Sequence, residues 1–305
     1  MTPDGRHAIS ASSDHTLKVW DLGTGAELRT LSGHTSVVRA VAVTPDGRRA
    51  VSASFDETVK TWDLETGLEL HTLAGHGDLI VAVTAMADGR RVVSGSLDHT
   101  LKVWDVATGM QLRTLAGHRD EVRAVEVTPD ACRSVSSSVD QTMRLWDTDT
   151  GEELSAFTGH GRGMNAVAVT PDGRRALSVF GDGMLDVYDL TQMARTRGFR
   201  TDSGPSACAV APVGTGIVAG DSGGRVYILQ LENVPPGPPI ISAWFAPGDS
   251  TPAFGCLHCR VWSEVPTSAL STELPCPHCG KAVKLNPFVI EADWRPVAAA
   301  WRGDP

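Results

Sequence analysis

The sequence predicts an all-β protein, a β-propeller of about six blades followed by a small cysteine-rich module. Three observations lead to this fold class. Gly-His pairs recur every 42 residues, at positions 33–34, 75–76, 117–118 and 159–160. The residues between the pairs contain four short segments of strand character, and two Cys-x-x-Cys pairs occur near the C-terminus. A fixed period of this length indicates one supersecondary unit copied along the chain.

The unit that begins at Gly33 shows the pattern most clearly. Apolar residues alternate with polar ones at period 2, and β-branched residues are frequent, as expected of half-buried and buried strands. Pro45-Asp46-Gly47 indicates a turn, because Pro presets φ and Gly supplies a positive φ. Four short antiparallel strands in about 40 residues are typical of a propeller blade. The predicted strands of this unit are residues 37–43, 50–53, 59–62 and 68–73.

Trp-Asp pairs continue the repeat at positions 20–21, 62–63, 104–105 and 146–147, with Tyr188-Asp189 in the fifth unit. With its Gly-His and Trp-Asp pairs, the unit resembles a WD40 repeat. The resemblance implies a hydrogen-bonded set in each blade: the Gly-His histidine, a second-strand Ser, a loop Asp and the third-strand Trp. The three complete sets are His34, Ser52, Asp56 and Trp62; His76, Ser94, Asp98 and Trp104; and His118, Ser136, Asp140 and Trp146. The fifth unit has His160, Ser178, Asp182 and Tyr188, and the first has Ser10, Asp14 and Trp20.

Ser, His and Asp together also form a nucleophilic triad in many hydrolases, which requires an oxyanion hole and an open cleft. The alternative is structural, since a buried indole N–H, imidazole and carboxylate must satisfy one another's hydrogen bonds. An enzyme has no use for the same set in several copies. We therefore expect a structural network and no catalytic residues.

The two ends of the repeat array are irregular. Thr2-Pro3-Asp4-Gly5 matches the turn at residues 44–47, so the first unit lacks its innermost strand. A sixth unit is visible only in outline, at residues 208–228, where Asp221 keeps the loop-aspartate spacing to Tyr227. We expect the propeller to span residues 1–232. Residues 233–250 then form a Pro-rich linker or, through residues 240–246, the strand that closes the first blade; an outer strand of the last blade is a further alternative.

Three positions of the repeat carry the clearest differences between units. In propellers that resemble this one, these positions ring one face and commonly contact partners. Apolar side chains flanked by arginines are typical of protein interfaces, although scattered exposed apolar residues also occur without function. The expected partner rim consists of Arg39, Phe55, Leu79, Leu97 and Arg123.

Cys256, Cys259, Cys276 and Cys279 form a C-x2-C-x16-C-x2-C pattern. This spacing lets four thiolates converge on one zinc ion, with a hairpin between the pairs. The segment at residues 251–290 resembles a zinc ribbon, and residues 291–305 are expected to be a tail. A redox pair and iron–sulfur ligation are the alternatives. Four cysteines fill a tetrahedral shell, so His258 and His278 are expected to be bystanders and the zinc structural.

Net charge, apolar runs and cysteine spacing exclude some classes of function. The formal net charge of −9 argues against broad attraction to nucleic acid or anionic membranes. No leader sequence and no apolar run of about 18 residues is apparent, and paired Cys-x-x-Cys spacing suits a reducing compartment, so we expect a cytoplasmic protein. The favoured function is a non-catalytic scaffold that binds a protein partner, with no membrane or small-molecule substrate. The alternatives are a nucleic-acid adaptor that uses the ribbon and the arginines of residues 195–200, and the sensor part of a longer signalling protein.

Overall fold

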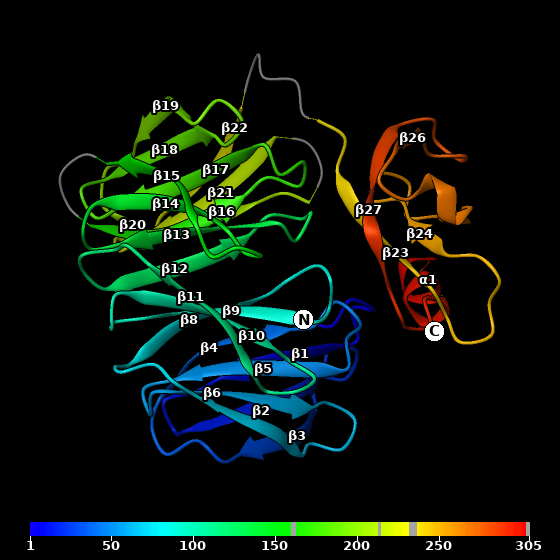
Figure 1. Ribbon diagram of the computed structural model, residues 1–305, viewed down its shortest axis with the longest axis horizontal. Coiled ribbons are helices and arrows are strands. Elements are labelled where there is room, and N and C mark those ends of the chain that lie inside the picture. Colours follow the sequence, from blue (N-terminus) through cyan, green and yellow to red (C-terminus); the bar gives the residue numbers. More distant parts are fainter. Residues whose placement is uncertain (160–162, 213–214, 232–236, 303–305) are drawn as a thin grey trace.

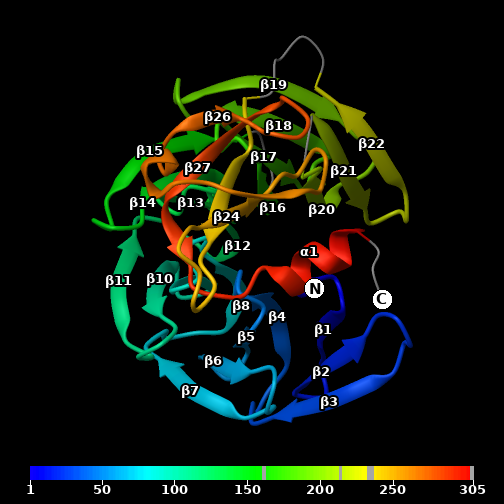
Figure 2. The same ribbon diagram turned by 90° about the vertical axis from the view of Figure 1, so that its right-hand side faces the viewer.

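The computed structural model describes residues 1–159, 163–212, 215–231 and 237–302, and these residues form seven β-sheets and one α-helix. Six of the sheets follow one another along the chain and are arranged around a common centre (Figure 2). The seventh belongs to a C-terminal module on one face of this arrangement (Figure 1). His160 and the first part of the Pro-rich segment, residues 232–236, lie outside the described residues.

The second to fifth sheets each contain four antiparallel strands in sequence order, as the repeat predicts. Their strands are β4 (Val38–Val43), β5 (Arg49–Ser54), β6 (Thr58–Asp63) and β7 (Glu69–Ala74); β8 (Ile80–Ala85), β9 (Arg91–Ser96), β10 (Thr100–Asp105) and β11 (Gln111–Ala116); β12 (Val122–Val127), β13 (Arg133–Ser138), β14 (Thr142–Asp147) and β15 (Glu153–Thr158); and β16 (Met164–Val169), β17 (Arg175–Phe180), β18 (Met184–Asp189) and β19 (Ala194–Arg200).

The first and sixth sheets have three strands each among the described residues. The first contains β1 (His7–Ala11), β2 (Thr16–Asp21) and β3 (Glu27–Ser32), and the sixth contains β20 (Pro205–Val210), β21 (Gly216–Asp221) and β22 (Val226–Gln230). The sixth sheet thus occurs where its outline predicted it, but with a different alignment. Gly220 pairs with Val226 as Gly95 pairs with Leu101, which places Asp221 at the position of Ser96 and not at that of the loop aspartate.

Local chemistry explains why each unit folds in the same way. In the turn after β4, the Thr44 hydroxyl donates to Asp46 and accepts from the Arg49 N–H, and Gly47 adopts a φ of 72°. A register shift between Thr61 and Trp62 then bends the third strand at its tryptophan. The same shift precedes the corresponding aromatic residue in the first and third to fifth sheets.

The core of the repeat array lies between neighbouring sheets. Trp62 of the second sheet packs against Leu17 and Leu31 of the first, and Trp104 of the third packs against Val59 and Leu73 of the second. Trp146 and Tyr188 repeat this contact one and two sheets later. The third-strand aromatic residue of the second to fifth sheets therefore faces the preceding sheet, and each of the first five sheets buries its opposite face under the following one.

The C-terminal sheet has the strand order β25-β24-β23-β27-β26. Its strands are β23 (Ile240–Trp244), β24 (Ala253–Gly255), β25 (Trp262–Glu264), β26 (Glu273–Pro275) and β27 (Ala282–Ile290), with a short 3₁₀ turn at Thr267–Ala269 and the helix α1 (Arg295–Arg302). No helix in the described part of the chain is long and apolar enough to cross a bilayer.

The expectation that residues 240–246 close the first sheet is wrong, and so is the alternative of an outer strand on the last one. β23 pairs in parallel with β27 and antiparallel with β24. The physical reason is that Ala243 and Trp244 bury their side chains among apolar residues of the C-terminal module itself. The sheet of this module therefore begins at Ile240, upstream of the expected boundary at residue 251.

Candidate functional site

The three complete hydrogen-bonded sets are present with nearly the same geometry. In the second sheet, the His34 Nδ1–H donates to Asp56 over 2.7 Å, and Nε2 accepts from the Ser52 hydroxyl over 2.7 Å. The Trp62 indole N–H donates to the same Ser52 oxygen over 2.8 Å. The sets of His76 and His118 repeat these bonds at 2.7–2.9 Å. One hydroxyl thus satisfies two buried groups and fixes the histidine tautomer.

The hydrogen bonds of each set also shift the acidity of its members. Burial raises the pKa of the Asp56 carboxyl, but donors on Thr58, Thr35 and His34 outweigh this effect and lower that pKa to about 2. Burial likewise raises the pKa of Asp98 and of Asp140, and hydrogen-bond donors again outweigh it, so both pKa values are lowered. Burial lowers the pKa of the His34 and His118 rings. The sets of His34 and His118 therefore combine an ionised carboxylate with a histidine that stays neutral near neutral pH.

The arrangement fits a structural network better than a nucleophilic one. The Ser52, Ser94 and Ser136 side chains are completely buried, so no substrate can reach their oxygens. Each of these oxygens also accepts from an indole N–H, which occupies a lone pair that a nucleophile would use. In the first sheet, the Trp20 N–H likewise donates to Ser10 over 2.8 Å, whereas Tyr188 of the fifth contacts Asp186.

The four predicted metal-binding cysteines converge at the tips of two hairpins. Cys256 and Cys259 lie between β24 and β25, and Cys276 and Cys279 lie between β26 and β27. All four Sγ atoms lie within 4.8 Å of one another. The Sγ atoms of Cys256 and Cys279 are 3.8 Å apart, and those of Cys259 and Cys276 are 3.7 Å apart. A tetrahedral ion with Zn–S bonds of ~2.3 Å needs Sγ–Sγ separations of about 3.8 Å, so this donor set fits a metal ion of that size.

The two hairpin tips have matching backbone turns. The Arg260 N–H donates to the Cys256 carbonyl over 2.7 Å, and the Gly280 N–H donates to the Cys276 carbonyl over 2.9 Å. Both Arg260 and Gly280 have positive φ, at 59° and 71°. Although burial raises it, the pKa of Cys276 is lowered to about 7 by the backbone N–H groups of Cys279 and His278. Backbone donors therefore favour a thiolate at Cys276, which is the form that binds metal, whereas burial raises the pKa of Cys256 to about 12 and also raises the pKa of Cys259.

The C-terminal module covers the face of the array that carries the turns between the first and second strands (Figures 1 and 2). The Asn286 side-chain amide donates to the Pro129 carbonyl and to the Ser242 hydroxyl, each over 2.9 Å. The Ile240 N–H donates to the Pro171 carbonyl over 2.9 Å. Phe288 packs against the buried cluster between the third and fourth sheets. These contacts fix the module to turns of successive repeat units.

Asn286 and Phe288 were not singled out in the sequence as contact residues between the module and the repeats. Asn286 is 2% exposed in an apolar stretch of β27, and a lone buried amide in such a strand usually has a specific partner. The tryptophans of the module, in contrast, form its own small core. The Trp262 and Trp294 rings stack at 5.2 Å, and Trp244 and Trp301 pack on Trp262.

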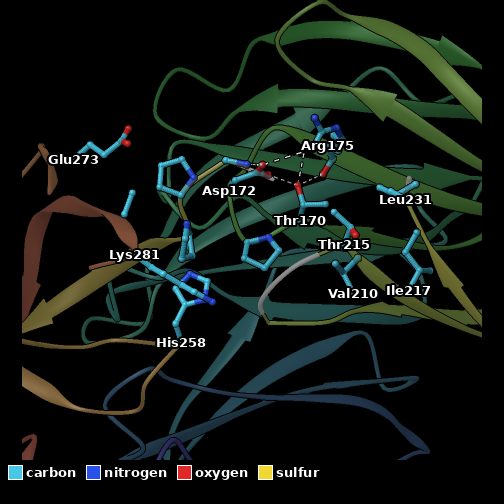
Figure 3. Close-up of a pocket in the computed structure, with 15 residues that line it drawn as sticks. Thr170, Asp172, Arg175, Val210, Thr215, Ile217, Leu231, His258, Glu273 and Lys281 are labelled. Atoms are coloured by element: carbon cyan, nitrogen blue, oxygen red, sulfur yellow. Dashed lines mark hydrogen bonds and ion pairs between the residues drawn. The ribbon is translucent and has the colours of Figure 1, made fainter. Parts of the chain in front are cut away.

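A cavity of about 640 Å³ lies between the module and the fifth and sixth sheets (Figure 3). Thr170 and Asp172 line it from the turn after β16, and Arg175 lines it from the start of β17, where all three bind one another. His258, Glu273 and Lys281 line it from the module (Figure 3). Both signs of charge face this space, so no single class of charged ligand is favoured by its lining.

The opposite face of the array is hollowed at its centre. Four of the expected rim residues line this hollow of about 580 Å³: Arg39, Phe55, Leu97 and Arg123. Leu79 does not line it, although its carbonyl accepts from the Leu97 N–H over 2.9 Å. The expected exposed apolar patch is instead half-buried, since Phe55, Leu79 and Leu97 are each only partly accessible to solvent. Arg39 and Arg123 are exposed, and Arg123 pairs with Glu121.

The arginine-rich segment at residues 195–200 lies in β19, the exposed outer strand of the fifth sheet. Arg195 donates to the buried Asp186 carboxylate over 2.7 Å. One of the three arginines is therefore neutralised within the sheet, which weakens the case for a phosphate-binding strand.

A comparison with protein-family models matches the family described as WD domain, G-beta repeat. The matched residues are 1–21, 25–63, 67–105, 109–147 and 151–189. These five matches cover more than half of the 305 residues and end before the sixth sheet.

Proposed function

Since this chain belongs to the WD40-repeat family, we propose that it is a non-catalytic protein-interaction scaffold with a six-bladed propeller. Repeats of this family generally mediate protein–protein interactions and are generally non-catalytic. In our proposal, the rim formed by Arg39, Phe55, Leu79, Leu97 and Arg123 binds a protein partner. The four-cysteine module is a zinc ribbon that adds a second structural or contact element, and the protein acts in the cytoplasm.

The observation that carries this proposal is the difference between the two faces of the array. The C-terminal module already covers the face with the turns at Ala87, Pro129 and Pro171. The rim face instead has a central hollow with apolar walls and exposed arginines. A concave apolar surface with arginines at its edge has the composition of a protein-binding site.

The chemistry of the rim indicates the kind of partner. Phe55, Leu97 and Val139 offer apolar contact around the hollow, and Arg39 supplies an exposed positive charge within a chain of net negative charge. A protein segment with an apolar side chain beside a carboxylate complements such a surface, because the arginine binds carboxylate oxygens through two parallel donors.

The proposed zinc has a structural role. Four thiolates complete a tetrahedral shell and leave no open position for a substrate or a water molecule. Small modules with one metal ion gain folding free energy from the metal, because their apolar core alone is too small. The side chains of Cys256 and Cys276 are part of that core, together with Phe254 and Leu285.

Quantitative affinity purification tests the rim. The double variant R39E/F55A changes two rim side chains, and R29E/L68A changes the same residue classes at exposed positions outside it. We expect specific co-purifying proteins to be lost with the rim variant and retained with the control. Equal retention by both variants, with both folded by circular dichroism, would contradict the assignment of the rim.

A further inference from the structure

An apolar pocket of about 380 Å³ lies between the fifth and sixth sheets, and we call it the outer pocket. Its walls come from β18 and β19 of the fifth sheet and from β21 and β22 of the sixth, which are neighbours in the array (Figure 2). The apolar side chains of its lining are Leu185, Val187, Phe199, Ile217, Leu229 and Leu231. A pocket of this size with mainly apolar walls is typical of small-molecule sites.

Pairing register explains why the outer pocket exists. Val226 and Leu101 pair with equivalent glycines in the sixth and third sheets. Leu229 follows Val226 by three residues, as Trp104 follows Leu101, so Leu229 has the position of the third-strand aromatic residue. A leucine side chain is much smaller than an aromatic ring. Part of the space that the ring fills in the second to fifth sheets is therefore unfilled in the sixth.

The walls of the outer pocket correspond to the surroundings of an indole ring in another sheet. The ring of Trp62 packs against three side chains of the first sheet: Leu17, Val19 and Leu31. By strand pairing, the equivalent residues of the fifth sheet are three that line the outer pocket: Leu185, Val187 and Phe199. The outer pocket is thus bounded like the site of an aromatic ring between two sheets.

The exposure of Phe199 shows that this ring site is open to solvent. Residues at its position in the first four sheets are at most 7% exposed, because the aromatic residue of the following sheet covers them: Leu31, Leu73, Leu115 and Phe157. Phe199 is 42% exposed. An aromatic ring bound beside Phe199 and Leu229 would remove this apolar surface from water, which is favourable.

The residue beside this ring site indicates which kind of ring fits. Ala219 has the position of Ser94, whose hydroxyl accepts from the Trp104 indole N–H. Ala219 is 1% exposed and offers no side-chain acceptor. A buried N–H without an acceptor is costly, so a ring without a polar donor fits this site better than an indole does.

The mouth of the outer pocket indicates the polar part of the ligand. Arg197 and Gln230 line it there, and both are exposed. Among the described residues, Arg197 forms no ion pair, whereas its neighbour Arg195 is paired with Asp186. A guanidinium group binds a carboxylate through two parallel donors. A carboxylate a short distance from the ring would therefore complement Arg197.

We propose that the outer pocket binds a small aryl carboxylate, a molecule with one phenyl-type ring and a short arm that ends in a carboxylate. The ring lies beside Phe199 and Leu229, and the carboxylate binds Arg197 at the mouth. The proposal involves binding only, so this ligand is not a substrate. The outer pocket is separate from the rim and from the cysteine cluster, so failure of this proposal leaves the proposed scaffold function intact.

Saturation-transfer NMR titrations of the full chain with phenylpropionate, and with its neutral analogue phenylpropionamide, test the proposal. L229F fills the outer pocket with a ring of the protein itself, and L112F adds the same ring at an exposed leucine of β11. R197Q removes the cation at the mouth. Its control is R29Q, at the equivalent position of the first sheet, where Trp62 already fills the ring site.

We expect phenylpropionate to bind the native chain with a Kd of about 1 mM or below. R197Q should weaken its binding about tenfold and leave phenylpropionamide unaffected, because only the acid loses a charge-assisted hydrogen bond. L229F should abolish the binding of both compounds, while L112F and R29Q should bind them as the native chain does.

Three results would overturn the proposal. The first is no binding of phenylpropionate to the native chain at about 10 mM, and the second is equal affinity of folded L229F and the native chain. The third is an unchanged affinity of R197Q for phenylpropionate, which does not depend on the folding of L229F because Arg197 is exposed. Binding of a capped Phe-Asp peptide without binding of phenylpropionate would also overturn it and would identify a protein segment as the occupant.

Discussion

The burial of the Ser–Trp hydrogen bond differs between repeat units, and this difference allows a sharp test of what the networks contribute. Ser94→Ala in the third sheet removes the oxygen that the Trp104 N–H and the His76 ring both bind, at 2.8 Å each. Both partners are buried, with Trp104 1% and His76 7% exposed. Ser10→Ala removes the same bond from the half-exposed Trp20. Ser10→Ala is therefore a matched control for Ser94→Ala, because it removes the same kind of bond at a more exposed site.

The expected magnitudes follow from the number of groups left without a partner. A buried donor or acceptor without a partner costs about 1–3 kcal/mol, so two such groups give about 2–6 kcal/mol for Ser94→Ala. In Ser10→Ala, water replaces the serine at the exposed indole, and the expected loss is below about 1 kcal/mol. The loss for Ser94→Ala would be a large fraction of the total stability of a typical domain.

Urea denaturation followed by far-ultraviolet circular dichroism measures both losses, since it does not depend on the fluorescence of the altered tryptophan environment. The comparison is valid where the two variants unfold with the same slope as the native chain. Equal losses for the two variants, or a loss below about 1 kcal/mol for Ser94→Ala, would refute the argument that burial makes these networks structural.

Three further outcomes are expected. Cys276→Ser should remove one zinc ion per chain in native mass spectra and make the module sensitive to proteases, while Cys132→Ser, an exposed cysteine outside the cluster, should change neither. Asn286→Leu should lower the free energy of unfolding by about 1–3 kcal/mol in urea titrations, because the partly buried Pro129 carbonyl and the Ser242 hydroxyl both lose their donor. Stability should fall with pH in two windows: below about 6.5, because burial lowers the pKa of His34 and the unfolded chain takes up the proton, and from about 4 toward 2, as the Asp56 carboxylate is protonated. Stability curves from pH 7 to pH 2 check this, and His34→Gln should flatten the upper window in part, because burial also lowers the pKa of His118.

Local patterns predicted the repeat well. The spacing of His34, Ser52, Asp56 and Trp62 predicted a bonded set because all four residues belong to one unit of adjacent antiparallel strands. The 16-residue spacing between the two cysteine pairs predicted their convergence for a similar reason, since short hairpins hold both pairs. Contacts of this kind depend on short stretches of chain and therefore recur with the sequence.

The sixth unit marks the limit of this approach. Its sequence placed Asp221 at the loop aspartate by spacing alone, and the pairing of Gly220 with Val226 shifts the strands by two residues. A shift of two preserves which side chains face inward, so the alternation of apolar residues cannot detect it.

By itself, the sequence determined the all-β repeat, the family, the buried networks and the cysteine cluster, because each depends on residues close together in one unit or hairpin. Only the tertiary structure decided that Ile240–Trp244 joins the C-terminal sheet and that Asn286 binds the Pro129 carbonyl of the repeat array. It also decided that Val226 and Ile228 of the sixth sheet remain exposed. The physical reason is that an apolar strand can pair with any edge of suitable length. Which edge it takes, and which face stays open, depends on the packing of segments that are distant in the chain.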